Sequence, residues 1–415
     1  MSQVLNSFDE LNLDENLKKG LQKAGFSAPT EIQSRALPYV LERKDVFIRS
    51  KTGTGKTAVF LIPIINHLES NKLSVQPSAL IVLPTRELSL QVWHVARQLC
   101  SFSDIKAAVV YGGVSLNPQI DKLRRGVDIV VGTPGRILDL IHRRALDIGK
   151  IKFLVLDEAD LMLDIGFIDD IEQIIKETPK SKQVILLSAT LLKEVEGIAK
   201  KYMNNPVYIS SDDSALIVDT IKNDFIVVNY RDKFSALLAF LDEHKPRKAI
   251  VFVEQKRSVY FVSDLLRKFG YSPISLHGGM TQKQREFSIE EFKAEEAGLL
   301  IATNVAARGL DIPNITDIIN FDAPDDPKVY IHRVGRSARM GKDGRAFTIF
   351  TNGQRGLLND IERMSGKEFN EISLDLSKFS NAEGNNFERD LNPLSYENNH
   401  GRQRFYHPSN RRLEG

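Results

Sequence analysis

The sequence has little of three features that define large classes of proteins. Among its 415 residues Cys100 is the only cysteine, so an internal disulfide and a cysteine-based metal site are excluded, and a structural thiol in a reducing compartment is expected. No apolar run approaches the roughly 18 residues that cross a bilayer, and the N-terminus is acidic where a signal peptide would be basic and then apolar. These absences predict a cytoplasmic protein.

A large net charge is also absent, because 56 Lys and Arg residues face 54 Asp and Glu residues. Such a balance argues against a simple polycationic coat for nucleic acid. The signs are segregated along the chain, however: residues 51–150 hold 13 Lys and Arg against 7 Asp and Glu, whereas residues 151–200 hold 6 against 10. The small total charge therefore does not exclude a nucleic-acid partner.

Short runs of Val, Ile and Leu alternate with amphipathic segments of helical length, which predicts parallel sheets covered by helices. One set lies at 45–49, 79–83, 128–131, 153–156 and 184–187, and a second set at 249–253, 273–276, 299–302, 316–320 and 346–350. The length and a polar stretch between the sets predict two α/β domains. The expected divisions are a first domain 1–208, a linker 209–221, a second domain 222–366 and a polar, flexible tail 367–415.

The two halves contain similar motifs in the same order. Tyr111-Gly112-Gly113 in the first half and His277-Gly278-Gly279 in the second each precede a predicted strand that ends in a threonine motif. Two diverged copies of one unit would explain this similarity, and so would the common use of Gly-Gly turns after strands.

The tail ends in a mixture of basic and aromatic residues, which either binds RNA by charge and stacking or is an ordinary solvated terminus. Both questions stay open at this point.

A glycine-rich turn from Ser50 to Thr57 lies between the strand 45–49 and the apolar, helix-like run 58–65. Backbone N–H groups in such a turn converge on phosphate oxygens, assisted by the positive end of the helix dipole. We expect Lys56 to reach the β- and γ-phosphates and the Thr57 hydroxyl to complete the shell of a Mg²⁺ ion. Ser50 stands where the general pattern has its first glycine.

An acidic motif, Asp157-Glu158-Ala159-Asp160, directly follows the strand 153–156. Ligands of open parallel sheets bind at the carboxyl ends of the strands. We therefore expect Asp157 to hold Mg²⁺ through water and Glu158 to orient or deprotonate the attacking water.

Arginines recur at three-residue spacing in the second half, at Arg333, Arg336 and Arg339. On a helix this spacing puts the guanidinium groups on one face. They merely coat a surface, bind backbone phosphates, or act as arginine fingers that neutralise charge in the transition state. The arginine-finger interpretation requires both domains to close on one nucleotide.

These motifs in this order resemble the DEAD-box RNA helicases over about residues 8–350. The resemblance implies two tandem RecA-like domains, each a mostly parallel sheet flanked by helices. It implies a monomeric, ATP- and Mg²⁺-dependent RNA helicase, in which RNA-stimulated ATP hydrolysis drives local separation of short RNA duplexes, or remodelling of RNA–protein complexes, without sequence specificity. An ATP-gated RNA clamp with little unwinding and a DNA helicase of the wider superfamily are alternatives.

The resemblance also assigns roles to individual residues. It implies an ATP site in which Gln33 reads adenine, Phe8 stacks on it and Asp311 contacts the ribose; its members are Phe8, Phe26, Thr30, Gln33, Ser50, Lys51, Thr52, Gly53, Thr54, Gly55, Lys56, Thr57, Gly309 and Asp311. RNA contacts are implied for Pro84, Thr85, Arg86, Gly113, Thr133, Pro134, Arg136, Gly278, Gln282, Arg285 and Thr303. The catalytic set is Lys56, Asp157, Glu158, Arg336 and Arg339, with Thr57 and Asp157 toward Mg²⁺. Coupling of the two sites is implied for Asp160, Ser188, Thr190, His332 and Arg333, with hydroxyl contacts to Asp160.

Five residues at three places depart from the usual pattern of that family. Ser50-Lys51 stands where Ala-Gln is usual, Asn304 where Asp is usual, and Ser337-Ala338 where Thr-Gly is usual. Lys51 adds a positive charge beside the phosphate loop, and Ala338 restricts the backbone next to Arg339. Nucleotide affinity and arginine geometry are the properties that these departures affect.

Overall fold

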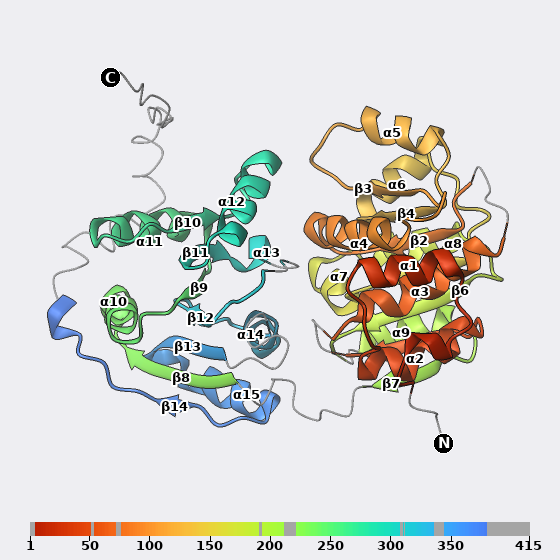
Figure 1. Ribbon diagram of the computed structural model, residues 1–415. Coiled ribbons are helices and arrows are strands. Elements are labelled where there is room, and N and C mark those ends of the chain that lie inside the picture. Colours follow the sequence, from red (N-terminus) through yellow and green to blue (C-terminus); the bar gives the residue numbers. More distant parts are fainter. Residues whose placement is uncertain are drawn as a thin grey trace, which may run out of the picture.

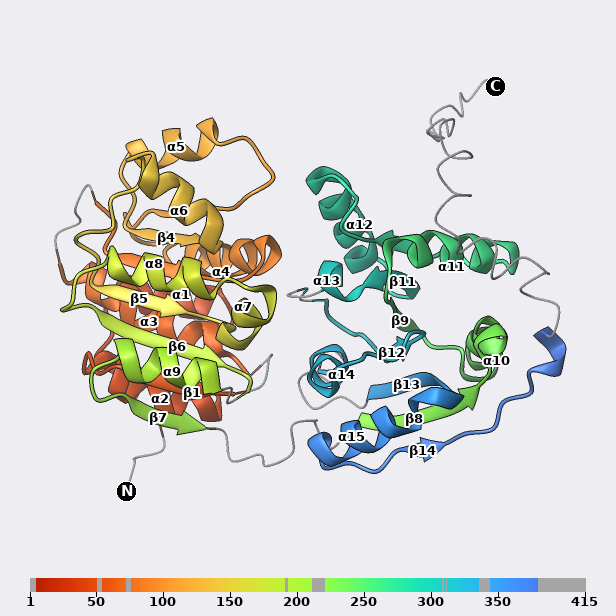
Figure 2. The same ribbon diagram turned by 180° about the vertical axis from the view of Figure 1, so that it is seen from behind.

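The computed structural model describes residues 5–50, 54–71, 76–190, 193–210, 221–307, 310, 312–335 and 344–379. They form two α/β units, each built on a seven-stranded sheet with helices on both faces (Figures 1 and 2). Every strand pairing in both sheets is parallel. The predicted fold class is confirmed.

The first unit holds its strands in the order β3-β4-β2-β5-β6-β1-β7. The strands are β1 (Val46–Arg49), β2 (Ala79–Val82), β3 (Ala107–Val110), β4 (Ile129–Gly132), β5 (Phe153–Leu156), β6 (Gln183–Ser188) and β7 (Val207–Ser210). The helices are α1 (Glu15–Lys23), α2 (Glu31–Leu41), α3 (Lys56–Glu69), α4 (Arg86–Leu99), α5 (Asn117–Arg124), α6 (Pro134–His142), α7 (Ala159–Ile165), α8 (Ile168–Lys176) and α9 (Lys193–Tyr202).

The second unit holds its strands in the order β10-β11-β9-β12-β13-β8-β14. The strands are β8 (Ile221–Val228), β9 (Lys248–Val253), β10 (Ile274–Leu276), β11 (Gly298–Thr303), β12 (Asp317–Asn320), β13 (Gly344–Thr351) and β14 (Asn370–Glu371). The helices are α10 (Lys233–His244), α11 (Lys256–Lys268), α12 (Gln282–Ala294), α13 (Asn304–Ala307), α14 (Pro327–Val334) and α15 (Arg355–Ser365).

The two sheets have one topology. When the strands of each unit are numbered from its own first strand, both orders read 3-4-2-5-6-1-7. Gly-Gly turns alone do not produce a shared order of seven strands. The fold therefore favours two diverged copies of one unit over coincidence of turns.

Each sheet separates two hydrophobic cores, because successive strand residues point to opposite faces. In β1, Val46 and Ile48 pack into the core beneath α1 to α4, whereas Phe47 packs into the core beneath α5 to α9. Cys100 lies in the first of these cores at the end of α4 and is buried, as expected for a structural thiol. Burial of both faces explains why the strands read as continuous apolar runs.

The predicted linker and the predicted tail differ in their bounds from the structure. Ile209 and Ser210 belong to β7 and Ile221 begins β8, so these three residues of the predicted linker are in strands, while 211–220 lie outside the described residues. Residues 367–379, assigned to the tail, pack on the second sheet: β14 pairs with β8, and Leu374 is buried in the core beneath α10 and α11. Strand β14 consists of two exposed polar residues, Asn370 and Glu371, so no apolar run marks it in the sequence. Among the described helices, none is long and apolar enough to cross a membrane.

Candidate nucleotide and nucleic-acid site

The sheet of the first unit brings the predicted motifs to one edge in two adjacent groups. Because all strands are parallel, their carboxyl ends share this edge. Strands β5, β6 and β1 are neighbours and form the first group, and strands β3, β4 and β2 are neighbours and form the second group. The first group carries the acidic motif, Ser188 to Thr190 and the phosphate loop. The second group carries the predicted RNA motifs that follow β3, β4 and β2. Strand order therefore places two candidate sites side by side.

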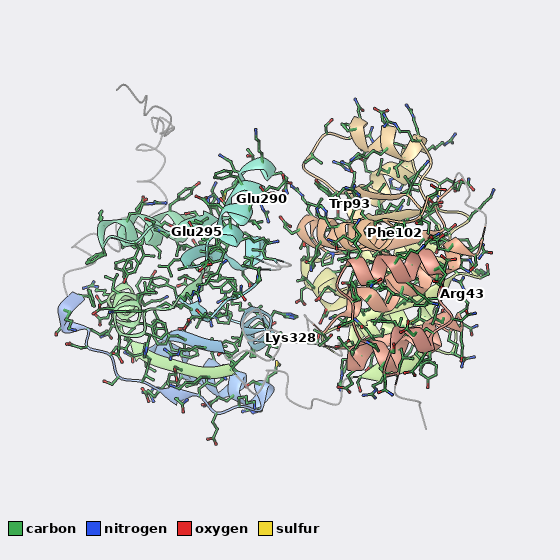
Figure 3. The ribbon with its side chains drawn as sticks, viewed as in Figure 1. Arg43, Trp93, Phe102, Glu290, Glu295 and Lys328 are labelled. Atoms are coloured by element: carbon green, nitrogen blue, oxygen red, sulfur yellow. The ribbon has the colours of Figure 1, made fainter. Side chains whose placement is uncertain are left out.

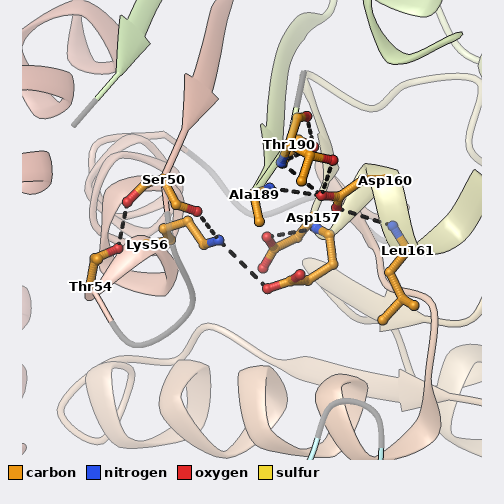
Figure 4. Close-up of polar contacts among 10 residues, drawn as sticks. Ser50, Thr54, Lys56, Asp157, Asp160, Leu161, Ala189 and Thr190 are labelled. Atoms are coloured by element: carbon orange, nitrogen blue, oxygen red, sulfur yellow. Dashed lines mark hydrogen bonds and ion pairs between the residues drawn. The ribbon is translucent and has the colours of Figure 1, made fainter. Parts of the chain in front are cut away.

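The phosphate loop joins β1 to α3, and Lys56 is the first residue of that helix. Gly55 has φ of 90°, and a side chain there would meet the Gln33 amide at 2.5 Å, so the position requires glycine. Ser50 bonds the Thr54 hydroxyl at 2.8 Å, which closes the loop at its base. Figure 4 shows this contact beside Lys56.

The Lys56 ammonium is buried and faces the acidic motif. It donates to the Ser50 carbonyl at 2.7 Å (Figure 4). It also lies 3.6 Å from Glu158 Oε1. Burial alone would lower the pKa of Lys56, but the carboxylates of the acidic motif outweigh burial and raise it. The site thus holds a charged ammonium ready for an anionic ligand.

Asp157 and Glu158 lie at the end of β5 with less than a tenth of their surface exposed. Asp157 Oδ1 accepts from the Glu158 N–H at 2.9 Å, and Glu158 has a left-handed backbone with φ of 53°. Burial and the Glu158 carboxylate raise the pKa of Asp157 to about 7, against the opposing effect of Lys56. Strained, desolvated carboxylates next to a cation are typical of catalytic sites.

Asp160 ties the acidic motif to the end of β6. Its Oδ2 accepts from the N–H groups of Ala189 and Thr190 at 3.1 and 2.8 Å and from the Thr190 hydroxyl at 2.9 Å (Figure 4). The predicted hydroxyl contact from Thr190 is thus present. Ser188 instead donates to the Thr190 carbonyl at 2.6 Å.

The predicted adenine-reading segment lies against the phosphate loop. Gln33 is buried, accepts from Thr30 N–H at 2.9 Å and donates to the Gly55 carbonyl at 2.9 Å. Each end of its amide retains the capacity for one further hydrogen bond. Phe8 is buried edge-on against Phe26, with ring centroids 6.4 Å apart.

The residues predicted to contact RNA in the first unit begin helices at the same edge of the sheet. Thr85 is the N-cap of α4 and Thr133 is the N-cap of α6, with Pro134 in its first turn. Gly113 has φ of 78°, and a side chain there would meet the Arg86 guanidinium at 2.3 Å. Helix N-termini and guanidinium groups are suited to backbone phosphates.

Two contacts join the units across these motifs. Arg86 Nη1 donates to Gln282 Oε1 at 2.9 Å, and Arg285 Nη2 lies 2.8 Å from Glu87 Oε1. Glu87, which was not among the residues predicted to bind RNA, is therefore the acidic partner of Arg285, which was. Its place directly after Arg86 was the signal that could have identified it.

Other predicted residues are separated from these contacts or lie outside the described residues. Arg136 donates to the Val114 carbonyl at 3.1 Å, His332 is half-buried on α14, and Thr303 ends β11. Gly278 and the following Gly279 are exposed. The following predicted residues and departures fall outside the described ranges: Lys51, Thr52, Gly53, Gly309, Asp311, Arg336, Ser337, Ala338 and Arg339.

The chemistry of the site fits a magnesium ion that arrives with a nucleotide. Within the described ranges, no group of three or more His, Cys, Asp or Glu residues could hold a metal by itself. Mg²⁺ typically keeps several waters and binds one or two carboxylates together with substrate phosphates. Asp157, whose raised pKa a nearby cation would lower, and the half-buried Thr57 match this mode.

Comparisons with known proteins agree with this arrangement. The family model described as DEAD/DEAH box helicase matches residues 30–198, and the helicase conserved C-terminal domain matches residues 232–341. The chain is 41% identical over 363 residues to ATP-dependent RNA helicase CshA of Listeria monocytogenes, covering 88% of this chain and 69% of that protein. It is 38% identical over 366 residues to DEAD-box ATP-dependent RNA helicase CshA of Bacillus subtilis, covering 88% and 74%.

Solved structures show the same two-unit architecture. Saccharomyces cerevisiae Dbp5 bound to RNA and ADP BeF3 aligns with a TM-score of 0.81 at 32% identity, over 93% of this chain and all of that chain (100%). Mss116p bound to ssRNA and AMP-PNP aligns with a TM-score of 0.79 at 28% identity, over 88% and 78%. A DEAD box protein from Methanococcus jannaschii is 36% identical over 89% and 99%, yet its TM-score is 0.53. The overall arrangement is therefore closer to the RNA-bound structures.

Proposed function

The chain belongs to the DEAD-box family of ATP-dependent RNA helicases, which are RNA-dependent ATPases, and from this premise we propose how its residues divide the work. ATP and single-stranded RNA jointly close the two units, hydrolysis reopens them, and a short duplex is separated locally. The observation that carries this proposal is the strand order of the first sheet, which sets the nucleotide half and the RNA half of one edge next to each other. Asp160 and Thr190 link two strands of the nucleotide half.

In the nucleotide half, Lys56 binds the terminal phosphates and Glu158 orients or deprotonates the attacking water. Support comes from the burial of both side chains and from their separation of 3.6 Å, since a phosphate that enters here replaces Glu158 as the main partner of the ammonium. Gln33 and Phe8 recognise adenine, and Arg336 and Arg339 contribute from the second unit after closure. Asp311 and Gly309 contact the ribose side of the nucleotide.

Asp157 and Thr57 would hold Mg²⁺ together with the phosphates, largely through water. When bound, the ion neutralises charge that develops on the phosphoryl oxygens. Asp157 supplies a desolvated carboxylate whose pKa is raised by burial and by the neighbouring Glu158 carboxylate. Chelation with EDTA is expected to abolish ATP hydrolysis while leaving the melting temperature of the nucleotide-free protein unchanged.

In the RNA half, the backbone phosphates lie across the helix N-termini at Thr85 and Thr133 and continue to Thr303 in the second unit. Such contacts reach phosphate and sugar, so binding is independent of base sequence. Cytoplasmic RNA is the expected substrate pool, in keeping with the single buried thiol of Cys100.

A clamp that holds RNA without unwinding is the second candidate, favoured by the Glu87–Arg285 ion pair between the units. A long-lived closed complex would then persist after hydrolysis. Stopped-flow measurement of RNA release, alongside separation of a short duplex, distinguishes the two: a helicase releases RNA at the rate of ATP turnover, whereas a clamp releases it much more slowly.

RNA-stimulated ATP hydrolysis tests the assignment of the site. Lys56→Ala and Glu158→Gln are each expected to reduce stimulated turnover by at least about a hundredfold, because each removes a group that acts on the transition state. Lys182→Ala, which changes a lysine at the opposite end of β6, is the matched control and should retain turnover. Stimulated turnover that survives either site substitution contradicts the assignment.

A further inference from the structure

Helix α13 is held from both ends by arginines of neighbouring helices. Arg285 of α12 donates from Nη2 to the Ala306 carbonyl at 3.3 Å, and Arg333 of α14 donates from Nε to Asn304 Oδ1 at 3.4 Å. Thr303, the candidate RNA contact, directly precedes this four-residue helix. Thr303 is therefore joined directly to the helix that these two arginines contact.

Arg333 is anchored on its other side by stronger contacts. It is 4% exposed, and its Nη1 donates to Asn320 Oδ1 at 2.9 Å and to the Asp322 carbonyl at 2.8 Å. Its guanidinium also lies over the Phe252 ring, 4.9 Å from the centroid. Arg333 thus fixes α14 to the ends of β9 and β12.

The contact to Asn304 is the weak link in this group. Its 3.4 Å length exceeds the usual range of about 2.7–3.2 Å, and the acceptor is a neutral amide facing a charged, buried donor. A carboxylate in the same place would form a shorter, charge-assisted hydrogen bond. The residue type at position 304 therefore sets the strength of the connection between α13 and α14.

The connection lies between two functional elements. Toward the first unit, Arg285 also pairs with Glu87 at 2.8 Å. On the other side of the connection, α14 directly precedes the segment that contains Arg336. Lys328, near the start of α14, lies on the side of the second unit that faces the first unit (Figure 3). Position 304 is the junction between the RNA contact and the arginine-bearing helix.

We propose that Asn304 is a positioning residue that sets how strongly RNA binding at Thr303 is coupled to nucleotide binding through α14, and that its amide keeps this coupling weak. The inference rests on the proposed function, because it assumes that Thr303 contacts RNA and that arginines after α14 reach the nucleotide. Coupling is reciprocal, so the effect is measurable from RNA affinity alone.

The experiment measures the dissociation constant of a fluorescent single-stranded RNA with and without a non-hydrolysable ATP analogue and Mg²⁺. The ratio of the two constants reports the coupling. Asn304→Asp is expected to raise this ratio about fivefold, because a charged acceptor forms a stronger hydrogen bond with Arg333 than a neutral one does. Asn304→Leu, which has no acceptor, is expected to lower the ratio by about the same factor. RNA affinity without the analogue should change less than twofold in Asn304→Leu.

Ser272→Asp is the matched control, since it adds the same charge at an exposed position of the second unit. Its ratio should equal that of the unmodified protein. If Asn304 has a purely structural role, both variants change the melting temperature and leave the ratio unaltered, and that result overturns the inference. A ratio lowered by Asn304→Asp overturns it as well. A ratio of one in the unmodified protein refutes the proposed function and this inference together.

Discussion

Glu87 of α4 and Arg285 of α12 form an ion pair between the two units, with Oε1 and Nη2 2.8 Å apart. The side chains are 11% and 15% exposed, so water screens the pair only in part. Glu87→Gln keeps the shape of the side chain and removes its charge. The substitution therefore isolates the contribution of the charge to closure of the units.

The size of the effect follows from this partial burial. Exposed ion pairs contribute about 0.2–1 kcal/mol, and breaking a buried pair costs about 3–5 kcal/mol, so this partly buried ion pair is expected to contribute about 1.5–3 kcal/mol. The loss falls on the closed arrangement, because both side chains are solvated when the units separate. With about 1.4 kcal/mol for each factor of ten, the ratio of closed to open protein is expected to fall about tenfold to a hundredfold.

Steady-state ATP hydrolysis at increasing RNA concentration measures this change. The RNA concentration that gives half-maximal stimulation should rise at least about tenfold in Glu87→Gln, whereas the rate without RNA stays the same. Asp264→Asn breaks an exposed pair with Arg267 inside α11 and serves as the control, with no expected change. If Glu87→Gln behaves like this control, the units do not close through the ion pair.

Three further predictions address other parts of the site. Gly55→Ala should weaken binding of an ATP analogue by more than about tenfold in calorimetry, because it combines a strained φ with an approach of 2.5 Å to Gln33; unchanged affinity would contradict the geometry. Thr190→Val removes the hydroxyl bond to Asp160 and should slow duplex separation about fivefold while basal ATP hydrolysis stays within twofold, and equal losses in both rates would argue against a coupling role. Burial, Lys256 and Arg285 lower the pKa of His277 to about 4, so the unfolded chain takes up its proton first as the pH falls below about 6.5 and stability is lost toward pH 4. The melting temperature of His277→Asn should therefore fall less between pH 7 and 5 than that of the unmodified protein, and equal slopes would refute the assignment.

Much of the fold could be predicted because both faces of each sheet are buried. The run Phe153 to Leu156 was predicted with its observed bounds, since four consecutive apolar residues have no polar position to blur them. The strands missing from the prediction, β3, β7, β8 and β14, are short, lie at or next to a sheet edge, or contain polar residues. In β8, for example, Asn223 and Asp224 are buried through hydrogen bonds that composition does not reveal.

The nucleotide half of the site was more predictable than the connections between sites. Lys56 and the acidic motif follow strands directly, so spacing in the sequence translates into proximity in space. The pairs Arg86–Gln282 and Glu87–Arg285 join residues that are about two hundred positions apart, and no local pattern marks such partners. Asn304 stood out as an unusual residue type, but its contact with Arg333 depends on how two helices pack.

Joint closure of the two units by RNA and ATP is the central claim, and energy transfer between two dyes measures it directly. Cys100 is buried, with a pKa that burial raises to about 12, so maleimide dyes will label cysteines introduced at the exposed positions Lys122 and Ser272 selectively. Transfer efficiency should rise to its maximum only when RNA and a non-hydrolysable ATP analogue are both present. Efficiency that reaches its maximum with either ligand alone, or that both together leave unchanged, would contradict the account.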